Sequence, residues 1–484
     1  MGRFGALIDG RWVPADEVGR EHATIRAPWD GASLGEVGLA EPAAVERAIA
    51  SAAQTFERSL RDPYPLHERL QVLERLARRI AEERESIART ISAEAGKPIT
   101  QARVEADRAI ATVNDSASAA KVVLGGEVLP LATAPASADR LGIDRRFPLG
   151  VVSAITPFNF PLNLAMHKVA PAIAAGCPVI LKPAPQAPLT AFRLAELCVE
   201  AGLRPGYLQL VYCDNATAAP LVEDPRIALL SFTGSARAGW ALKSRAGRKR
   251  VTLELGGNGA VIVDDCADLD AVAARIAAAS NGYAGQTCIS VQRVFVRRAL
   301  QDPLREALRA TVAGLAVGDP AADATVVGPV IDDAAASRIE SWVDAAIGAG
   351  ARLHGSLERQ GRLLHPILLE DVPPDQPVVR EEVFGPVATL EAYDDFDDAI
   401  DRVNASPFGL QAGVYARDVG RLFRAFDRLQ VGGVIHDDCP TFRVDAMPYG
   451  GTKESGCGRE GPRYAIEDMT EHRVLVLRLP GTAG

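Results

Sequence analysis

The sequence has no Cys-x-x-Cys pair, although it contains seven cysteines. The cysteines are scattered singly along the chain and their total is odd, which fits neither a disulfide framework nor a zinc site. We therefore predict no metal site. Each cysteine is by default a small buried hydrophobic side chain, unless its neighbours indicate a chemical role.

Long apolar runs are also absent. No stretch of about twenty apolar residues occurs, so no transmembrane helix is predicted. The amino terminus, MGRFGALIDGRWV, lacks the basic region and apolar run of a signal peptide. Ala6 stands where a myristoylation signal would need Ser or Thr. We expect a cytoplasmic protein with no membrane partner.

An excess of positive charge is missing too. The formal net charge is -9 over 484 residues, spread along the chain, which argues against a nucleic-acid partner. The densest basic run, RAGRKR at 245–250, is interpreted as a solvated helix end, with a contact to a cofactor phosphate as the alternative. Hydrophobic residues make up 48% of the chain, as in ordinary globular proteins. This length predicts two or three domains.

The spacing of apolar residues predicts helices first and strands later. Three- and four-residue spacing predicts helices within 42–95, ended by Gly96, and a further helix over 99–122. From 149 to 263, short β-rich runs alternate with helical stretches. That alternation indicates a doubly wound α/β unit, whose usual ligand is a dinucleotide. A second α/β domain is predicted after residue 264.

Two further segments have strand patterns of their own. Residues 125–148 show an alternating strand pattern and carry Gly and Pro at both ends, which predicts a strand pair outside the main core. The segment EHRVLVLRLP at 471–480 is an alternating strand that can pair with a distant segment or with another subunit.

Two positions are candidates for binding a cofactor. The G-x-G-x-x-G fingerprint is absent, and the best candidate turn is SFTGSARAG at 231–239. Gly234 and Ser235 there precede a helix start that favours a phosphate, although any strand-to-helix turn accepts these residues. Lys182 directly follows an apolar strand. It either binds a cofactor hydroxyl or phosphate or is a solvated charge at a strand end.

Three other residues are candidates for catalysis. Asn159 lies between two prolines in ITPFNFPLN, so its amide has a fixed acceptor, either a backbone carbonyl or an oxyanion. Glu254 lies in an apolar strand, where we expect a raised pKa and a role as proton acceptor or as a structural carboxylate bonded to backbone. Cys288, in GYAGQTCIS, is expected at a loop or helix start that stabilises a thiolate, though a single cysteine is more often inert.

Together these segments resemble the NAD(P)-dependent aldehyde dehydrogenase superfamily. They occur in the same order as in that family, and the match reaches MPYGGTKESGCGREGPRYAIEDMTE near the end. The resemblance implies an α/β aldehyde dehydrogenase fold with a Rossmann-like cofactor domain at 1–124 and 149–256 and an α/β catalytic domain at 257–450. It also implies an oligomerisation element, a β-hairpin at 125–148 with the terminal strand region at 465–484. Such an element implies a homodimer or homotetramer.

The resemblance also assigns roles to individual residues. It makes Cys288 the nucleophile, Glu254 the general base, and Asn159 a donor to the oxyanion beside the Cys288 backbone N–H. The residues expected to contact NAD or NADP are Thr156, Pro157, Lys182, Pro185, Gly234, Ser235, Gly256, Glu382 and Phe384. The implied reaction forms a thiohemiacetal on the cysteine, then a thioester, which the glutamate-activated water hydrolyses to a carboxylic acid.

The sequence departs from the family pattern at one cofactor position. Members that prefer NAD often carry a glutamate three residues after the lysine, and here that position is Pro185. Proline removes the carboxylate that would repel a 2′-phosphate, so NADP is permitted and slightly favoured.

The substrate is expected to be a short, polar or anionic aldehyde. The motifs look most like the branch that acts on lactaldehyde, glyceraldehyde 3-phosphate, succinate semialdehyde and phosphonoacetaldehyde. Arg108 and Arg443 are candidates to bind an anion, with structural salt bridges as the equal alternative. Phe160 stands where phosphonate-handling relatives use a histidine, and Phe158 replaces a common tryptophan. The remaining candidate substrate contacts are Thr287 and Ile289.

Two alternative functions stay open at the level of sequence. A coenzyme A-acylating relative would release an acyl thioester, but such enzymes generally lack a glutamate at position 254. A non-catalytic structural or binding relative would be free to lose Cys288, Glu254 or Asn159, and all three are present.

Overall fold

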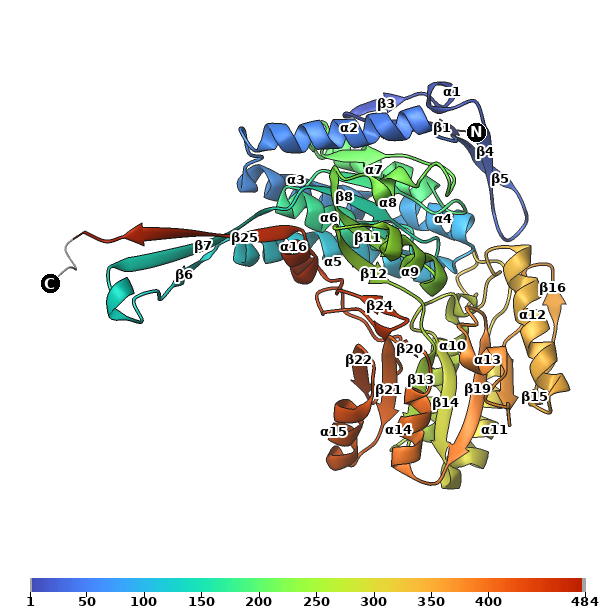
Figure 1. Cartoon of the computed structure of the whole chain (residues 1–484). Coiled ribbons are helices and arrows are strands. Elements are labelled where there is room, and N and C mark those ends of the chain that lie inside the picture. Colours follow the sequence, from blue (N-terminus) through green and yellow to red (C-terminus); the bar gives the residue numbers. More distant parts are fainter. Residues whose placement is uncertain (1, 481–484) are drawn as a thin grey trace.

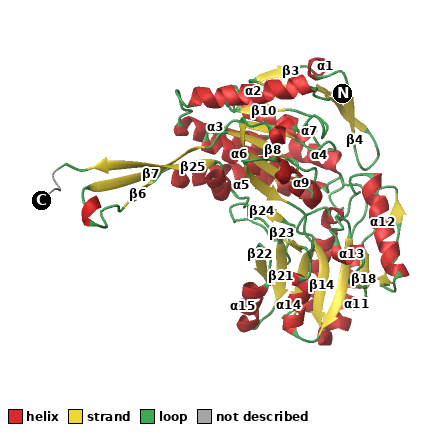
Figure 2. Cartoon of the chain, viewed as in Figure 1, coloured by secondary structure: helices red, strands yellow, loops and turns green. Residues whose placement is uncertain are grey.

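The computed structural model describes residues 2–480 and contains two open sheets flanked by helices, with a long β extension on one side (Figures 1 and 2). The first sheet has eight strands in the order β24-β12-β11-β8-β9-β10-β2-β3. The central strands from β12 to β10 are parallel, and the outer three are antiparallel to their neighbours. Its strands are β2 (Ala6–Ile8), β3 (Arg11–Val13), β8 (Val151–Ile155), β9 (Val179–Lys182), β10 (Leu208–Leu210), β11 (Ile227–Thr233), β12 (Arg250–Glu254) and β24 (Gly456–Cys457).

Helices cover both faces of this sheet. Val151 and Ile180 face one side and pack with residues of α2, whereas Val152 and Leu181 face the other and pack with α6. Neighbouring residues of a parallel strand face opposite sides of the sheet, and here both sides are buried. This explains the nearly continuous apolar runs. The helices of this half are α1 (Ala15–Val18), α2 (Pro42–Ser59), α3 (Leu66–Glu82), α4 (Arg84–Ala95), α5 (Ile99–Val123), α6 (Asn163–Ala175), α7 (Leu189–Glu200), α8 (Pro220–Glu223), α9 (Ala236–Arg245) and α16 (Pro462–Asp468).

The second sheet has seven strands in the order β15-β18-β19-β14-β13-β21-β22, and every pairing except β15–β18 is parallel. Its strands are β13 (Gly259–Val263), β14 (Val291–Arg297), β15 (Arg352–His354), β18 (Ile367–Glu370), β19 (Val387–Tyr393), β21 (Gln411–Tyr415) and β22 (Gly433–His436). The helices of this half are α10 (Leu269–Asn281), α11 (Gln301–Ala313), α12 (Asp333–Gly348), α13 (Pro377–Arg380), α14 (Phe396–Asn404) and α15 (Val419–Arg428).

The smaller elements lie at the edges of these two sheets. A three-stranded sheet near the amino terminus contains β1 (Gly2–Phe4), β4 (His22–Arg26) and β5 (Ser33–Gly38). Two short pairs join β16 (Arg359–Gln360) to β17 (Leu363–Leu364) and β20 (Phe408–Gly409) to β23 (Thr452–Lys453). Single 3-10 turns are η1 (Pro135–Ser137), η2 (Gly282–Gly285) and η3 (Arg298–Leu300).

The α/β class and the two parallel sheets agree with the expectation from sequence, but the division that strand spacing placed after residue 263 does not. The run of strands expected from 149 to 263 splits, because β13 lies between β14 and β21 in the second sheet. The amino-terminal strands were not predicted, and three of them, β1, β2 and β3, have only three residues, too few to show a period. β24 also joins the first sheet from a segment more than two hundred residues downstream of β11.

The extension consists of β6 (Glu127–Leu129), β7 (Arg140–Pro148) and β25 (Thr470–Arg478), which project away from the body (Figure 1). β25 pairs antiparallel with β7 over its whole length, from Thr470 opposite Pro148 to Arg478 opposite Arg140. The region assigned to the element at 465–484 begins too early, because 465–468 complete α16; residues 481–484 lie outside the described residues. Among the described residues, no helix is both long and apolar enough to cross a bilayer.

A buried ion pair holds the loop that follows β8. The Lys97 ammonium contacts the Glu105 carboxylate, and neither side chain is exposed. The other carboxylate oxygen of Glu105 accepts hydrogen bonds from the backbone N–H groups of Leu162 (2.9 Å) and Asn163 (3.1 Å). This pair therefore fixes the loop to α5.

We expect Glu105→Ala to lower the free energy of unfolding by about 3 to 5 kcal/mol, because it leaves the Lys97 charge buried without its partner. Chemical denaturation of both proteins measures this loss. Asp107→Ala is the matched control on the same helix, since Asp107 pairs with Arg84 on an exposed face and such pairs contribute little. Equal effects of the two substitutions would contradict the role assigned to Glu105.

Candidate active site

The loop before β14 is held in an unusual conformation. Tyr283 and Ala284 have φ values of 55° and 52°, which non-glycine residues rarely adopt, and both are fully buried. The Tyr283 hydroxyl donates to the Ala95 carbonyl at 3.0 Å, and the Ile331 N–H donates to the Gln286 side chain at 2.9 Å. Strain of this kind persists only where the surroundings over-determine it, and it concentrates at functional sites.

Cys288 lies in this loop, three residues before β14. Its Sγ lies 2.9 Å from the Tyr449 hydroxyl. Cys288 is partly exposed, and it lies in a loop rather than at a helix start. Loss of solvent around the sulfur raises the pKa of the Cys288 thiol to about 12, which favours the neutral thiol over the thiolate expected from the sequence.

Asn159 approaches the same loop from the first sheet. It follows β8, and its side-chain N–H donates to the Gln286 carbonyl at 2.9 Å. Of the two acceptors expected for the Asn159 amide, a backbone carbonyl or an oxyanion, the structure shows the carbonyl, which accepts from one of the two N–H groups. The bond holds the amide two residues from Cys288, with one N–H still available.

Glu254 is the last residue of β12 and is only 3% exposed. Neither carboxyl oxygen has a hydrogen-bond partner among the described residues, so the alternative of a carboxylate bonded to backbone is wrong. Burial raises the pKa of Glu254 well above its ordinary value, and the nearby charge of Glu460 adds to this effect. The negative charge of ionised Glu254 also contributes to raising the pKa of the Cys288 thiol.

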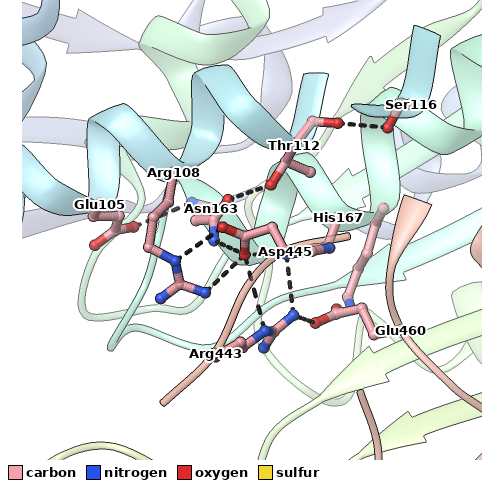
Figure 3. A network of polar contacts seen from close by, with 10 residues as sticks. Glu105, Arg108, Thr112, Ser116, Asn163, His167, Arg443, Asp445 and Glu460 are labelled. Atoms are coloured by element: carbon pink, nitrogen blue, oxygen red, sulfur yellow. Dashed lines mark hydrogen bonds and ion pairs between the residues drawn. The ribbon is translucent and has the colours of Figure 1, made fainter. Parts of the chain in front are cut away.

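A network of paired charges connects α5 and α6 with the carboxyl-terminal segment that carries Arg443, Asp445 and Glu460 (Figure 3). Asp445 accepts two hydrogen bonds from Arg108 of α5, at 2.7 and 3.0 Å. It also contacts the Asn163 amide at 3.0 Å and the His167 imidazole at 2.9 Å, both on α6. Burial opposes ionisation, but His167 and Arg108 hold the pKa of Asp445 well below its usual range.

Glu460 is the second buried acid of the network. Its carboxylate accepts from Arg443 at 2.8 Å and from Lys168 at 3.3 Å. Burial opposes its ionisation, yet the charges of His167, Lys168 and Arg443 hold the pKa of Glu460 at about 2. Both Arg108 and Arg443 therefore form structural salt bridges, the alternative given for them above.

The predicted cofactor positions gather in two groups. In one, the Gly257 N–H donates to the Glu382 carboxylate at 3.0 Å, and a Cβ at Gly256 would collide with that carboxylate. Burial raises the pKa of Glu382 to about 7. Phe384 has a φ of 48° and packs edge-on against Phe158, with ring centroids 5.9 Å apart.

The other group lies at the carboxyl ends of β8, β9 and β11. Lys182 ends β9, is 4% exposed, and its ammonium has no hydrogen bond within residues 2–480. Its carbonyl accepts from the Thr156 N–H at 3.1 Å, beside Pro157. Ser235 caps α9 by accepting from the Ala238 N–H at 3.4 Å.

Two more predicted cofactor positions make backbone contacts here. The Gly234 N–H donates to the Glu254 carbonyl at 3.0 Å, and the Pro185 carbonyl accepts from the Tyr212 hydroxyl at 3.2 Å. A buried ammonium without a hydrogen bond and a capped helix terminus suit a dinucleotide with a diphosphate. These residues therefore fit NAD or NADP.

The predicted substrate residues lie in different surroundings. Ile289 packs against Leu410 and Tyr449 beside Cys288, and the Thr287 N–H donates to the Gly285 carbonyl at 2.9 Å. The Phe160 ring is covered by the Lys97 ammonium, which lies 3.5 Å from its centroid.

The sequence analysis missed several residues that the fold brings to this site. These are His167, Lys168, Tyr449, Asp445 and Glu460. One signal was available, because His167 and Lys168 lie in a helix whose residues are otherwise mostly apolar and all buried. Among the described residues, no group of three or more His, Cys, Asp or Glu side chains is arranged to hold a metal ion.

Comparison with known proteins identifies the family of this chain. The family model described as "Aldehyde dehydrogenase family" matches residues 12–475. The 3-sulfolactaldehyde dehydrogenase of Priestia aryabhattai is 40% identical over 478 residues, covering 99% of this chain and 98% of that protein.

Two solved structures superpose closely. Aldehyde dehydrogenase 21 from Physcomitrella patens, in complex with the reaction product succinate, has a TM-score of 0.95 and 38% identity, and 99% of each chain is covered. The NADP-dependent glyceraldehyde-3-phosphate dehydrogenase from Bacillus halodurans C-125, complexed with NADP, has a TM-score of 0.94 and 35% identity, covering 99% of this chain and 100% of that one. These matches confirm the resemblance and the fold expected from sequence. The chain belongs to the aldehyde dehydrogenase family and is an NAD(P)-dependent oxidoreductase acting on aldehydes.

Proposed function

We propose that this enzyme oxidises a short, anionic aldehyde to its carboxylic acid through a thioester on Cys288, with Glu254 as the base for hydrolysis. The observation that carries the proposal is the buried Glu254 carboxyl group, which lacks any hydrogen-bond partner among the described residues. Its negative charge, when ionised, also raises the pKa of the Cys288 thiol. A buried carboxyl group without a partner costs stability, so its retention favours a chemical role over a structural one.

The first step is attack of the Cys288 sulfur on the aldehyde carbon. The thiol loses its proton, a C–S bond forms, and the carbonyl oxygen becomes an oxyanion. The Cys288 backbone N–H makes no hydrogen bond within residues 2–480, and Asn159 has one unused N–H. These two donors would bind the oxyanion.

When bound, NAD(P) would supply the hydride acceptor that oxidation of the thiohemiacetal to an acyl thioester on Cys288 requires. Lys182 at the end of β9, Ser235 at the start of α9 and Glu382 beside Gly257 would hold it. Phe384, packed on Phe158, would border it.

Glu254 then removes a proton from the water that attacks the thioester. Its raised pKa suits this task, because a stronger base accepts a proton more readily at neutral pH. The C–S bond breaks, the carboxylic acid leaves, and the proton that Glu254 took from the water passes to the Cys288 sulfur.

NADP is the favoured cofactor. Pro185 supplies no carboxylate against a 2′-phosphate, and the Bacillus halodurans relative was crystallised with NADP.

The proposed anionic substrate is supported by the relatives and by the two arginines. The relatives act on 3-sulfolactaldehyde or carry succinate, and both molecules are short anions. Arg108 uses Nε and Nη2 for Asp445, and Arg443 uses Nη2 for Glu460, so each guanidinium keeps N–H groups that an anion could accept from.

The extension supports a proposed homodimer or homotetramer. Val474, Leu475 and Val476 of β25 are each at least half exposed. A projecting strand with apolar side chains on both faces is a surface that another subunit would cover.

Cys288→Ala should abolish reduction of either cofactor with succinate semialdehyde, lactaldehyde and a long apolar aldehyde, because no other thiol lies at the site. Absorbance of the reduced nicotinamide measures the rates, and the panel ranks NADP against NAD. Cys266→Ala, at a partly exposed thiol elsewhere in the second half, should keep full activity. Undiminished turnover by the Cys288 variant would refute the proposal.

Glu254→Gln should release about one equivalent of reduced cofactor per site and then turn over about 10²- to 10⁴-fold more slowly, because thioester hydrolysis loses its base. In the wild type, steady-state turnover should fall as pH falls through the raised pKa of Glu254, since only the ionised form is a base. Stopped-flow and steady-state assays measure both effects. Glu370→Gln, at a buried but hydrogen-bonded strand carboxylate, should show no such burst. A product that forms only when coenzyme A is added would instead favour the acylating alternative.

Arg108→Gln should raise KM for succinate semialdehyde about tenfold or more and leave KM for neutral propionaldehyde little changed, because of the two aldehydes only the anion would bind the N–H groups that Asp445 leaves free. Arg103→Gln is the matched control on α5, since Arg103 pairs with Glu85 and Asp323 instead. Equal losses for both aldehydes would show that Arg108 is only structural.

A further inference from the structure

Tyr449 contacts the reacting atom of the proposed nucleophile. Its hydroxyl oxygen lies 2.9 Å from the Cys288 Sγ, and the residue is 2% exposed. Within residues 2–480, neither this hydroxyl nor this sulfur has another hydrogen bond. Within this range, the two groups are therefore each other's only hydrogen-bond partners.

The position of Tyr449 is fixed on several sides. Its backbone N–H donates to the Glu460 carbonyl at 2.9 Å, and its carbonyl accepts from the Glu460 N–H at 2.6 Å. The ring packs against Ile289 and Leu410, which also border the thiol. Moving the hydroxyl away from Cys288 would disrupt this packing.

Arg443 lies against the open face of the Tyr449 ring. The guanidinium carbon is 3.7 Å from the ring centroid, and the hydrogen bond to Glu460 holds it there. A cation at this distance favours negative charge on the phenol oxygen and makes the hydroxyl a stronger donor.

The contact changes strength when the cysteine ionises. A thiol is a weak donor and a neutral sulfur is a weak acceptor, whereas a thiolate accepts strongly. Burial raises the pKa of Cys288, and the hydrogen bond with Tyr449 is the first of the effects that oppose it. Among the described residues, no other group donates a hydrogen bond to this sulfur, so Tyr449 is the donor in place for a thiolate.

We propose that Tyr449 is a catalytic hydrogen-bond donor that stabilises the Cys288 thiolate before it attacks the aldehyde. The thiol proton leaves to water or hydroxide, and the phenol keeps its own proton throughout. When the C–S bond forms, the negative charge moves to the carbonyl oxygen and the hydrogen bond to sulfur weakens. This inference rests on the proposed role of Cys288 as the nucleophile.

Tyr449→Phe removes only the hydroxyl and keeps the ring beneath Arg443. We expect the pH midpoint for alkylation of Cys288 by iodoacetamide to rise by about one to two units, and the rate at pH 8 to fall about tenfold to a hundredfold. Mass spectrometry of the modified peptide follows Cys288 alone, and kcat/KM should fall by a similar factor.

Tyr415→Phe is the matched control. Tyr415 forms the other buried tyrosine–cysteine contact, with its hydroxyl 3.6 Å from Cys439, and removing that hydroxyl should leave the alkylation profile of Cys288 unchanged. Replacing Tyr449 with a fluorinated tyrosine, whose phenol is more acidic, should lower the midpoint while preserving the shape of the side chain.

An unchanged or faster alkylation in Tyr449→Phe would overturn the proposal, because the hydroxyl would then be a bystander or a shield. A higher midpoint with fluorotyrosine would also overturn it. Failure of the proposed function would be recognised by a different result, namely aldehyde oxidation retained by Cys288→Ala.

Discussion

The need to pair buried charges governs the architecture around the site. Asp445 and Glu460 are both almost fully buried, and a buried carboxylate is tolerated only with cationic and hydrogen-bonding partners. Those partners come from α5, α6 and the segment before β24, which are far apart in sequence. The ion pairs therefore hold the carboxyl-terminal segment against the first half of the chain, and this segment carries Tyr449.

The same surroundings shift the pKa values of two neighbouring carboxyl groups in opposite directions. Lys168 and Arg443 help to hold the pKa of Glu460 low, whereas burial without a hydrogen-bond partner raises the pKa of Glu254. Gly450 leaves room for the Glu254 carboxyl group, since a Cβ at Gly450 would lie 2.8 Å from one of its oxygens. Two acids separated in this way can divide structural and chemical roles between them.

The site is assembled from the edges of both sheets. Asn159 and Lys182 follow parallel strands of the first sheet at their carboxyl ends, and Glu254 ends a third strand there, where open α/β sheets place their ligands. Cys288 precedes the amino end of a strand in the second sheet. Hydrogen bonding of Asn159 to the Gln286 carbonyl connects the two halves.

The sequence by itself determined the elements and the chemistry. Apolar spacing predicts the helices from 42 to 123 and the parallel strands, because period and composition are local properties. The motifs around Asn159, Glu254 and Cys288 identify the family, because the chemistry requires those residue types. Only the tertiary structure decided that Arg108 and Arg443 are already paired and that Tyr449 lies beside the Cys288 thiol. Tyr449 is 161 residues from Cys288 along the chain, and no local pattern encodes a contact or a degree of burial that arises from such a separation.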